Sequence, residues 1–347
     1  MLSTKQQFIE TQKKVEKMAS NGGFSLLSGN NIIGDSDFGF LANALEYIDT
    51  KLHRPVYKFF WQTAIPYKVV GGAMDYASFY KSNYSIANVN PIASGSNNVL
   101  ITAKAQLQKY STKVAAFTYI LEIGLIDEMK ADKIGYNILD EFQEGILMQH
   151  NKMMDRVTFF GLPNDSESYG YFNHPDVEVI EETDTAWADM DAVTFFTKIN
   201  EVLIKQVVAS EYAEDFVANR IHLPLALFGK LALPMAISGT NGASATTGVS
   251  LYQYLKDNLA IALAGYGVGE ISLVVNRYLA NIGTNGTGRI VIDRYNEDIA
   301  RGILGMDLTR GATVFDATSQ STKTTYMAFV GEPQIIRPIA IKYYDNK

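Results

Sequence analysis

The chain has 347 residues, and its composition is that of a folded protein. Its apolar content of 47% excludes wholesale disorder, and its length predicts about two domains at roughly 150 residues each. The chain has no cysteine, which excludes disulfides, thiolate nucleophiles, iron–sulfur clusters and cysteine-ligated zinc. Its net charge of −7 argues against sequence-independent nucleic-acid binding, which needs clustered Lys and Arg.

The sequence shows no secretory signal and no membrane span. The N-terminal residues 1–20 are charged and amphipathic, and they lack the apolar centre of a signal peptide. The longest uncharged stretch, Leu231–Leu255, contains several glycine, serine, threonine and asparagine residues, so it cannot cross a bilayer. We therefore expect a soluble protein without a membrane partner.

The chain begins with features of an arm. Residues 5–18 have the periodicity of a short amphipathic helix, and a Gly/Ser/Asn-rich linker follows at 21–34. Asp35 and Asp37 then offer an N-cap for a second helix, which reaches about Ile48. A helix ahead of such a linker either packs back on the body or binds another chain, and a frayed terminus is an equal alternative.

A polar excursion follows the arm. The chain is predicted to be extended around Trp61–Val70, and Gly71–Asn98 is rich in Tyr, Ser and Asn with two-residue alternation. The segment has too few apolar residues to form a core, so we expect a long hairpin directed away from the body. Two strands are predicted after it, at Val99–Ala105 and Thr112–Glu122.

The strongest periodic signal lies between residues 126 and 160. Apolar side chains recur there every three to five residues without a proline until Gly161 and Pro163, which predicts one helix of about 34 residues. A helix of about 50 Å suits an elongated scaffold better than a compact enzyme pocket.

The next segment is acidic, and the one after it alternates between helices and strands. Nine carboxylates lie between Val157 and Thr197 without a Lys or Arg, and we interpret them as a charged rim. The helices predicted beyond this segment are 189–209, one opened by Pro224, and 249–259. The strands are predicted at 218–223, 271–276, 289–293, 324–330 and 334–344. Strands that pair from both ends of the chain predict a discontinuous domain with residues 190–320 inserted as the other.

The sequence contains no local catalytic constellation. The four histidines, which are His53, His150, His174 and His222, are too far apart in sequence for a metal pair. We interpret His150 as a partnered core residue and His174 as part of a surface ion pair. Gly29 and Gly34 have the outer spacing of a phosphate-binding loop, but Asp35 stands where the lysine is needed.

Two groups of carboxylates are candidates for a catalytic or metal-binding site. Glu141 and Glu144 are spaced to share one helix face as an acid–base pair, although a solvated flank is the more common outcome of this spacing. The nine carboxylates lack the arrangement of a calcium loop. We therefore predict no catalytic, cofactor-binding or metal-binding residue, no cofactor, and a protein that is not an enzyme.

The order of elements nevertheless matches a known family. The segments that carry the match are Glu46–Leu52, Asp155–Asn164, Tyr169–Pro175 with Trp187, Arg289–Arg294 and Gln334–Tyr343. Over residues 37–347 the sequence resembles the major capsid proteins of tailed bacteriophages, which share the Hong Kong 97-type fold.

The resemblance implies an α+β, Hong Kong 97-like capsid fold with a long spine helix, an extended β-hairpin loop, and peripheral and axial domains. It implies an N-terminal arm at 1–60, the extended loop at 61–110, and the axial domain at 190–320. The peripheral domain is then 111–189, completed by 321–347. Relatives that crosslink covalently use a lysine of the extended loop, but Lys81 is most simply a surface residue.

The implied function is a major capsid protein that self-assembles into an icosahedral head shell around the phage genome. Its partners are then copies of itself in pentamers and hexamers, together with portal, scaffolding or decoration proteins. It encloses double-stranded DNA without sequence-specific binding, in a virion assembled in the host bacterial cytoplasm. An encapsulin-type nanocompartment is the alternative within the fold, and a carboxylate-dependent hydrolase built on Glu141 and Glu144 is the alternative of another class.

Overall fold

A computed structural model describes residues 55–87, 102–134, 138–238, 244–266, 268 and 270–347. The chain forms two units, Met1–Pro55 and Val56–Lys347, and almost all of the described residues belong to the second. The two helices predicted in the arm, the linker, His53 and the centre of the predicted hairpin lie outside the described residues.

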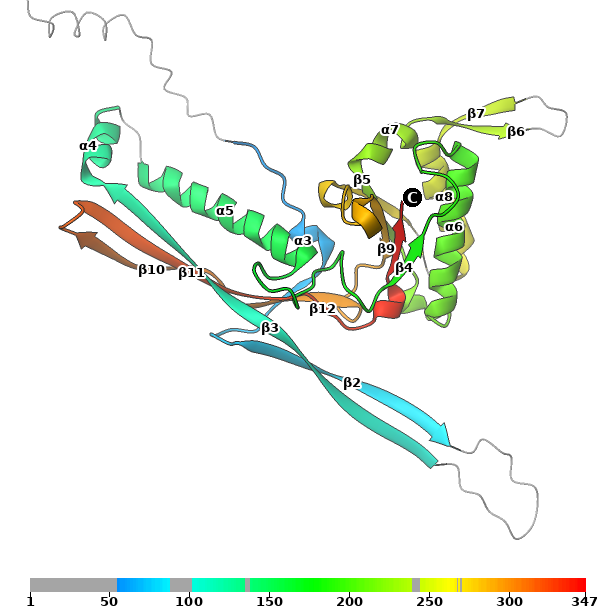
Figure 1. Cartoon of the computed structure of the whole chain (residues 1–347), viewed down its shortest axis with the longest axis horizontal. Coiled ribbons are helices and arrows are strands. Elements are labelled where there is room, and N and C mark those ends of the chain that lie inside the picture. Colours follow the sequence, from blue (N-terminus) through cyan, green and yellow to red (C-terminus); the bar gives the residue numbers. More distant parts are fainter. Residues whose placement is uncertain (1–54, 88–101, 135–137, 239–243, 267, 269) are drawn as a thin grey trace, which may run out of the picture. The chain divides into compact units, whose positions relative to one another are not determined.

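One six-stranded sheet has the strand order β1-β10-β11-β3-β2, and β12 also pairs with β10. Its strands are β1 (Tyr67–Val69), β2 (Tyr76–Ala87), β3 (Thr102–Gly124), β10 (Ala300–Asp316), β11 (Ser321–Gly331) and β12 (Gln334–Ile335). Only β1 pairs in parallel, and the other ladders are antiparallel. Figure 1 shows β2 and β3 continuing as a two-stranded ribbon.

Strand β3 belongs to two ladders. Its first half, Thr102–Lys113, pairs with β2, and its second half, Val114–Gly124, pairs with β11. The two strands predicted at Val99–Ala105 and Thr112–Glu122 are therefore one continuous strand within the described residues. The hairpin predicted within Gly71–Asn98 has other bounds: the described part of this segment contains one long strand, β2, and its partner strand lies beyond the segment, at Thr102–Lys113 of β3.

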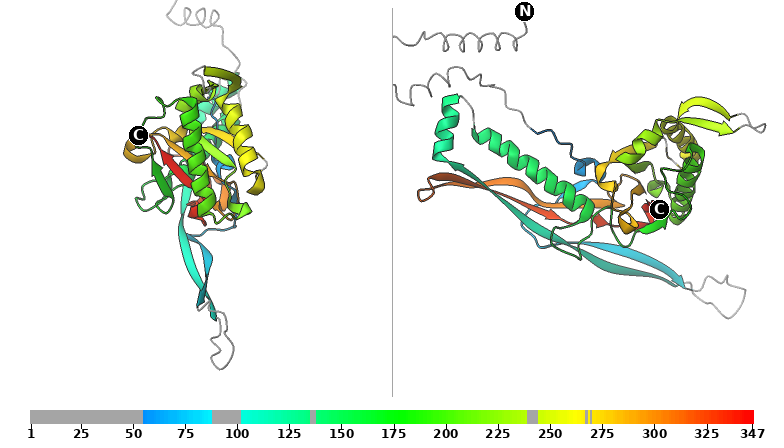
Figure 2. Two further views of the ribbon diagram at one scale, coloured as in Figure 1. Left: turned by 90° about the vertical axis from the view of Figure 1, so that its right-hand side faces the viewer. Right: turned by 45° about the horizontal axis from the view of Figure 1, so that its top comes forward.

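Helix α5 (Ile138–Phe160) covers one face of this sheet, as Figures 1 and 2 show. Near its C-terminal end, Met154 and Val157 pack against Leu304, Ala328 and Val330. Toward its N-terminal end, apolar residues of the helix pack against residues of β3 and β11. Those of the helix are Ile138, Leu139 and Ile146, and those of the strands are Leu121, Ile123 and Tyr326.

The single long helix predicted over 126–160 is wrong in one respect. The structure has two helices, α4 (Leu125–Ile134) and α5, which run in different directions in Figures 1 and 2. The sequence between them is Gly135, Tyr136 and Asn137. These three residues lie outside the described part of the chain.

The second sheet has five strands in the order β4-β13-β9-β5-β8. These strands are β4 (Glu178–Glu181), β5 (Arg220–Pro224), β8 (Ser272–Asn276), β9 (Arg289–Asp293) and β13 (Lys342–Asp345). Helices α6 (Ala192–Ala209) and α8 (Leu251–Leu263) contribute to the core on one face, together with Ile290 and Ile292. Val291 joins a second core with Phe159 and Tyr171, because successive side chains of a strand alternate between faces.

The remaining elements are short. The single-turn helices are α3 (Trp61–Ala64) and α7 (Phe228–Leu231), and β6 (Pro234–Ser238) pairs with β7 (Ser244–Ser250). The extended region predicted at Trp61–Val70 is thus interrupted by α3. The helix predicted after Pro224 is limited to a 3₁₀ turn, Leu225–Leu227, and α7.

Sheet membership does not follow the predicted domain ranges. Strand β10 lies within 190–320 but pairs with β11 of the six-stranded sheet. Strands β4 and β13 lie outside that range but belong to the five-stranded sheet. No strand was predicted at β10, whose distal half is exposed and carries little apolar alternation.

Candidate functional site

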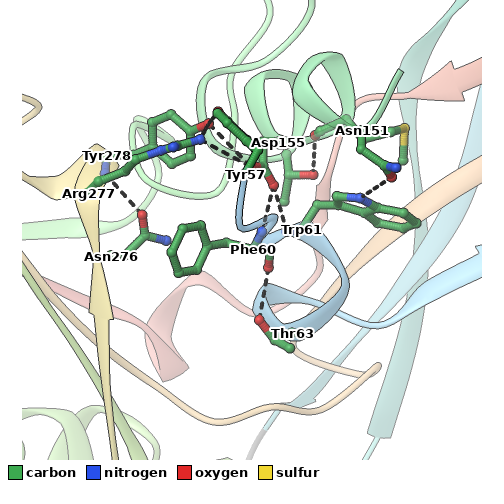
Figure 3. A network of polar contacts seen from close by, with 11 residues as sticks. Tyr57, Phe60, Trp61, Thr63, Asn151, Asp155, Asn276, Arg277 and Tyr278 are labelled. Carbon is green, nitrogen blue, oxygen red and sulfur yellow. Dashed lines mark hydrogen bonds and ion pairs between the residues drawn. The ribbon is translucent and has the colours of Figure 1, made fainter. Parts of the chain in front are cut away.

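The most connected polar network surrounds Asp155 of α5, which is fully buried (Figure 3). Its Oδ1 accepts hydrogen bonds of 2.8 Å from the backbone N–H groups of both Phe60 and Trp61. The N-terminal N–H groups of a helix have no partner within the helix, and Phe60 at the N-cap of α3 provides no side-chain acceptor. The carboxylate of Asp155 therefore caps α3 from a distant part of the chain.

The other oxygen of Asp155 faces the 3₁₀ turn Arg277–Leu279. Oδ2 accepts a hydrogen bond of 3.2 Å from the hydroxyl of Tyr278 and lies 3.7 Å from the guanidinium of Arg277. Burial raises the pKa of Asp155 above its ordinary value, although the backbone donors of Phe60 and Trp61 oppose the shift. Burial also raises the pKa of Tyr278 to about 12, and the nearby Asp155 adds to the shift.

A second network holds the opposite end of α3. Arg220 of β5 donates to the carbonyl oxygens of Thr63 and Ala64, at 2.7 and 2.6 Å. The same guanidinium makes two hydrogen bonds of 2.8 Å to the carboxylate of Asp293 on β9. Tyr171 also donates to this carboxylate.

The charges of this network stabilise one another. Burial by itself raises the pKa of Asp293, but Arg220 and His222 outweigh burial and hold the pKa well below its ordinary value. Burial lowers the pKa of His222 despite the nearby carboxylate, whose Oδ2 lies 3.3 Å from Nε2. Asp293 is consequently an ionised structural anion, and its oxygens are occupied by Arg220 and Tyr171.

At the opposite end of β9 the arginine lies on β9 itself, and its carboxylate partner lies on the neighbouring strand. Arg289 makes hydrogen bonds of 2.6 and 2.7 Å to the carboxylate of Asp345, which faces it across the β13–β9 ladder. The same guanidinium donates to the carbonyl oxygen of Phe172 at 2.6 Å. The backbone N–H and hydroxyl of Thr284 also donate to Asp345, at 2.7 and 2.9 Å. Both charges of this pair are therefore satisfied by the fold.

The described histidines are core or loop residues. His150 is buried, and its Nδ1 lies 3.4 Å from the hydroxyl of Tyr119, as expected for a partnered core residue. His174 lies 4.0 Å from the carboxylate of Asp176 and accepts a hydrogen bond from its backbone N–H. Burial lowers the pKa of both His150 and His174.

The predicted acid–base pair has no surroundings that favour catalysis. Glu141 is partly buried and Glu144 is exposed on α5. Neither residue lines the two cavities found in the described part of the chain, which have volumes of about 960 and 410 Å³. The larger cavity follows the edge strand β8, and the smaller lies beside Trp187 and Lys230.

The acidic segment is largely paired with cations from elsewhere in the chain. Lys113 bonds Asp165 at 2.7 Å, Lys342 bonds Glu178, and Lys198 lies 3.4 Å from Glu182. Glu182 is buried, so it does not belong to the charged rim predicted for this segment. Among the described residues, no group of three or more histidine and carboxylate side chains is arranged to hold a metal ion.

Lys81 of β2 lies on the two-stranded ribbon and contacts aromatic rings. Its Nζ is 4.5 Å from the ring centroid of Tyr110 and 5.6 Å from that of Phe79. These two rings stack across the β2–β3 ladder. Lys81 is half-buried, and burial lowers its pKa.

Exposed apolar side chains are the most unusual feature of the described surface. On the face of the six-stranded sheet opposite α5, the exposed fractions of Ile120 and Val314 are 66% and 60%. Met327 lies on the same face. On α4, Ile126 and Met129 are 62% and 57% exposed. Apolar side chains exposed together on one face of a sheet or helix are typical of contact with another molecule.

None of the described helices has a stretch long and apolar enough to cross a bilayer. The exposed apolar side chains of the six-stranded sheet and α4 are the functional feature that the described residues support. The polar networks around Asp155 and Asp293 connect α3 with α5, β5 and β9.

Comparisons with known proteins agree with this interpretation. The capsid of Myoviridae phage XM1 has a TM-score of 0.67 at 14% identity, covering 92% of this chain and all of that one. The capsid of a native GTA particle has a TM-score of 0.59 at 10% identity, covering 92% and 99%. A structure from Mycobacterium phage Bobi has a TM-score of 0.57 at 14% identity, covering 91% and 99%. No curated protein matches the sequence.

At these identities the structural matches establish the fold, which is Hong Kong 97-like as the sequence resemblance implied. A family profile described as "Major capsid protein" matches residues 90–346, which is most of the chain. The chain therefore belongs to the major capsid protein family, and it is a shell-forming capsid protein of the bacteriophage type.

Proposed function

We propose that many copies of the chain form an icosahedral shell of pentamers and hexamers around double-stranded DNA. The observation that carries this proposal is the exposure of Ile120, Val314 and Met327 on one face of a sheet whose other face is covered by α5. Burying such side chains against neighbouring copies is favourable by about 25 cal/mol per Å² of apolar surface. Contacts of this kind, repeated around symmetry axes, close a shell.

The two sheets have proposed roles in this shell. The five-stranded sheet with α6 and α8 corresponds to the axial domain, and the six-stranded sheet with α5 corresponds to the peripheral domain. The β2–β3 ribbon is the extended loop, and the residues before Pro55 belong to the arm. This assignment replaces the contiguous range 190–320 by sheet membership, because β10 pairs with β11 and β3.

The chain has a structural role and is proposed not to be an enzyme. The buried charged groups Asp155, Asp293 and Asp345 all have partners in the fold. Portal, scaffolding or decoration proteins are the proposed further partners, and assembly is proposed to occur in the cytoplasm of a host bacterium. The net charge of −7 favours an inner wall along which most of the packaged DNA slides.

Electron microscopy of the purified full-length chain tests this proposal. Closed, uniform particles are expected in negative stain, and particles from infected or expressing cells should protect DNA from nuclease. Particles that protect a protein cargo instead of DNA would indicate a nanocompartment and contradict the DNA-enclosing function. A chain that stays monomeric at high concentration would contradict shell formation itself.

A substitution at Ile120 tests whether shell formation depends on the exposed apolar face. Ile120→Lys should prevent shells while preserving the circular dichroism spectrum, because Ile120 points away from the α5 core. Val208→Lys is the matched control, since Val208 is also exposed but lies on α6. Normal shells from Ile120→Lys would show that assembly does not depend on this face.

A further inference from the structure

Cationic side chains gather where α5 ends and the chain enters the second unit. We define the basic cluster as Lys58, Lys152, Arg156 and Arg277. Lys58 belongs to the segment before α3, Lys152 and Arg156 lie one turn apart on α5, and Arg277 follows β8. Residues four apart on a helix share a face, so Lys152 and Arg156 extend the cluster along the helix.

Two aromatic rings hold the cluster together. The guanidinium of Arg277 lies 3.9 Å from the ring centroid of Tyr57, and Nζ of Lys152 lies 4.9 Å from the same centroid. Nζ of Lys58 lies 5.3 Å from the ring centroid of Phe60, and Arg277 lies 5.9 Å from it. Arg277 thus shares one ring with each lysine, and cation–π contacts offset part of the repulsion between the cations.

The cluster has little counter-charge in the described residues. The carboxylate of Asp155 lies 3.7 Å from Arg277, but it is buried and also accepts from two backbone N–H groups. Within the described ranges, no carboxylate forms an ion pair with Lys58, Lys152 or Arg156. The acidic residues of α5, Asp140, Glu141 and Glu144, lie toward the other end of this helix. The cluster is therefore a local positive surface on an acidic protein.

We propose that the basic cluster binds the phosphodiester backbone of double-stranded DNA without regard to base sequence. The proposal rests on the proposed function, because it takes the enclosed DNA as the ligand. DNA carries one phosphate about every 3.4 Å along each strand, so neighbouring cations of the cluster can each face a phosphate. Lys58, Arg156 and Arg277 are exposed and available for such contacts.

The surface around the cluster favours DNA over an acidic protein segment. Protein interfaces depend on apolar or aromatic anchors that fill pockets on the partner. Lys58 and Phe60 border the larger cavity, but Tyr57, Lys152, Arg156 and Arg277 line neither of the cavities described above, and the rings of Tyr57 and Phe60 are engaged by the cations. A phosphate backbone needs only cations on an open surface.

The proposed affinity of the basic cluster for DNA is low, because the cluster has few cations. Each neutralised phosphate contributes a slope of about −0.9 to the dependence of log K on log salt concentration, and only about four contacts are available. Weak, salt-sensitive contacts let DNA move during packing while they still favour its layers near the shell. The overall charge of −7 keeps the remaining surface from adding to this affinity.

Fluorescence anisotropy with a labelled random-sequence DNA duplex tests the proposal on the unassembled full-length chain. The triple variant Lys58→Ala, Lys152→Ala, Arg156→Ala leaves Arg277 in place, since that residue also contacts the Asp155 network. We expect this variant to bind at least about tenfold more weakly at low salt, with a salt slope smaller by about 2–3. The matched control is Lys104→Ala, Lys109→Ala, Lys205→Ala, which removes three exposed cations elsewhere and should bind as wild type.

Three results would overturn the proposal. These are wild-type affinity in the triple variant, an equal loss in the control, and a triple variant that forms no shells yet binds DNA normally. The last result would assign the cluster to contact with another copy of the chain. Electron microscopy of the same preparations separates these outcomes from failure of the proposed function, which would appear as absence of shells from the wild-type chain.

Discussion

Asp155 and Arg220 hold opposite ends of the same single-turn helix, α3. The carboxylate of Asp155 accepts from the N–H groups of Phe60 and Trp61, and the guanidinium of Arg220 donates to the carbonyls of Thr63 and Ala64. An anion at the N-terminus and a cation at the C-terminus match the free backbone groups and the dipole of a helix. Because Asp155 lies on α5 and Arg220 on β5, α3 connects the helix of one sheet with a strand of the other.

Arg220 is expected to be among the most costly residues to replace. Arg220→Met leaves Asp293 buried without its bidentate partner, and breaking one side of a buried ion pair costs about 3–5 kcal/mol. Urea unfolding followed by circular dichroism measures the change. Lys256→Met is the control, since the Lys256–Glu270 pair of 2.6 Å lies at the solvent-accessible surface and should contribute much less to stability. Equal losses in both variants would contradict the role of burial.

The contribution of Asp155 to the free energy of unfolding should depend more on its acceptor oxygens than on its negative charge. Asp155→Ala leaves two backbone donors of α3 without an acceptor and should reduce the free energy of unfolding by about 2–4 kcal/mol. Asp155→Asn keeps one acceptor oxygen and should lose less than half of that. Limited proteolysis should cut near Trp61 faster in the alanine variant. The same stability in both variants would show that ionisation, not acceptance, carries the contact.

The stability of the unassembled chain should decrease as the pH falls below the ordinary pKa of His222. Burial lowers the pKa of this side chain from 6.5, so the unfolded state binds the proton more readily than the folded state. The charged and titratable groups around it are Asp293, Arg220 and Tyr171. The stabilisation is fully present above pH 6.5 and is lost as the pH falls toward the folded pKa.

The variant His222→Phe tests this dependence. Phenylalanine keeps a ring beside Phe172, whose centroid lies 5.7 Å from that of His222. Urea unfolding at several values between about pH 7.5 and 5.5 should give a shallower slope than wild type. A slope remains in the variant, because burial also lowers the pKa of His150 and His174. If the slope of the free energy of unfolding against pH is the same in the variant and in wild type, His222 does not contribute to the pH dependence.

Two glycines should respond in opposite directions to alanine. A Cβ on Gly170 would lie 2.2 Å from backbone atoms of Phe159 and Phe160, so the chain must shift, at a cost of about 1–3 kcal/mol. A Cβ on Gly145 of α5 meets no atom within 4 Å, and alanine there should stabilise the helix by about 0.5–1 kcal/mol. Thermal unfolding of Gly170→Ala and Gly145→Ala measures both. Tolerance of Gly170→Ala would contradict the close backbone approach.

Shortening the β2–β3 ribbon should separate folding from assembly. Beyond Lys81 and Gln108, β2 and β3 pair only with each other, whereas nearer the body Gln334 donates to the carbonyl of Ala77 and to Thr112. Replacing residues 83–106 by an Asn-Gly turn should therefore leave the unfolding midpoint nearly unchanged. Electron microscopy should show few or no shells. Normal shells from this variant would remove the ribbon from the assembly contacts.

The sequence by itself determined the elements whose signal is local. The periodicity of 189–209 predicts α6, the apolar runs predict β5, β8 and β9, and the polar alternation after Gly71 indicates the extended segment that is β2. These features depend on residues within about one helical turn or one strand of each other, and such residues are close together in the sequence.

Only the tertiary structure decided which distant residues meet. Asp293 pairs with Arg220, and Asp345 pairs with Arg289, across ladders whose register no local pattern specifies. β10 was missed because its distal half is exposed, and its position is set by pairing with β11. The basic cluster likewise joins Lys58, Lys152 and Arg277, which are far apart in sequence. Contacts at such separations depend on the packing of whole elements, so a buried ion pair and a solvated charge have the same appearance in sequence.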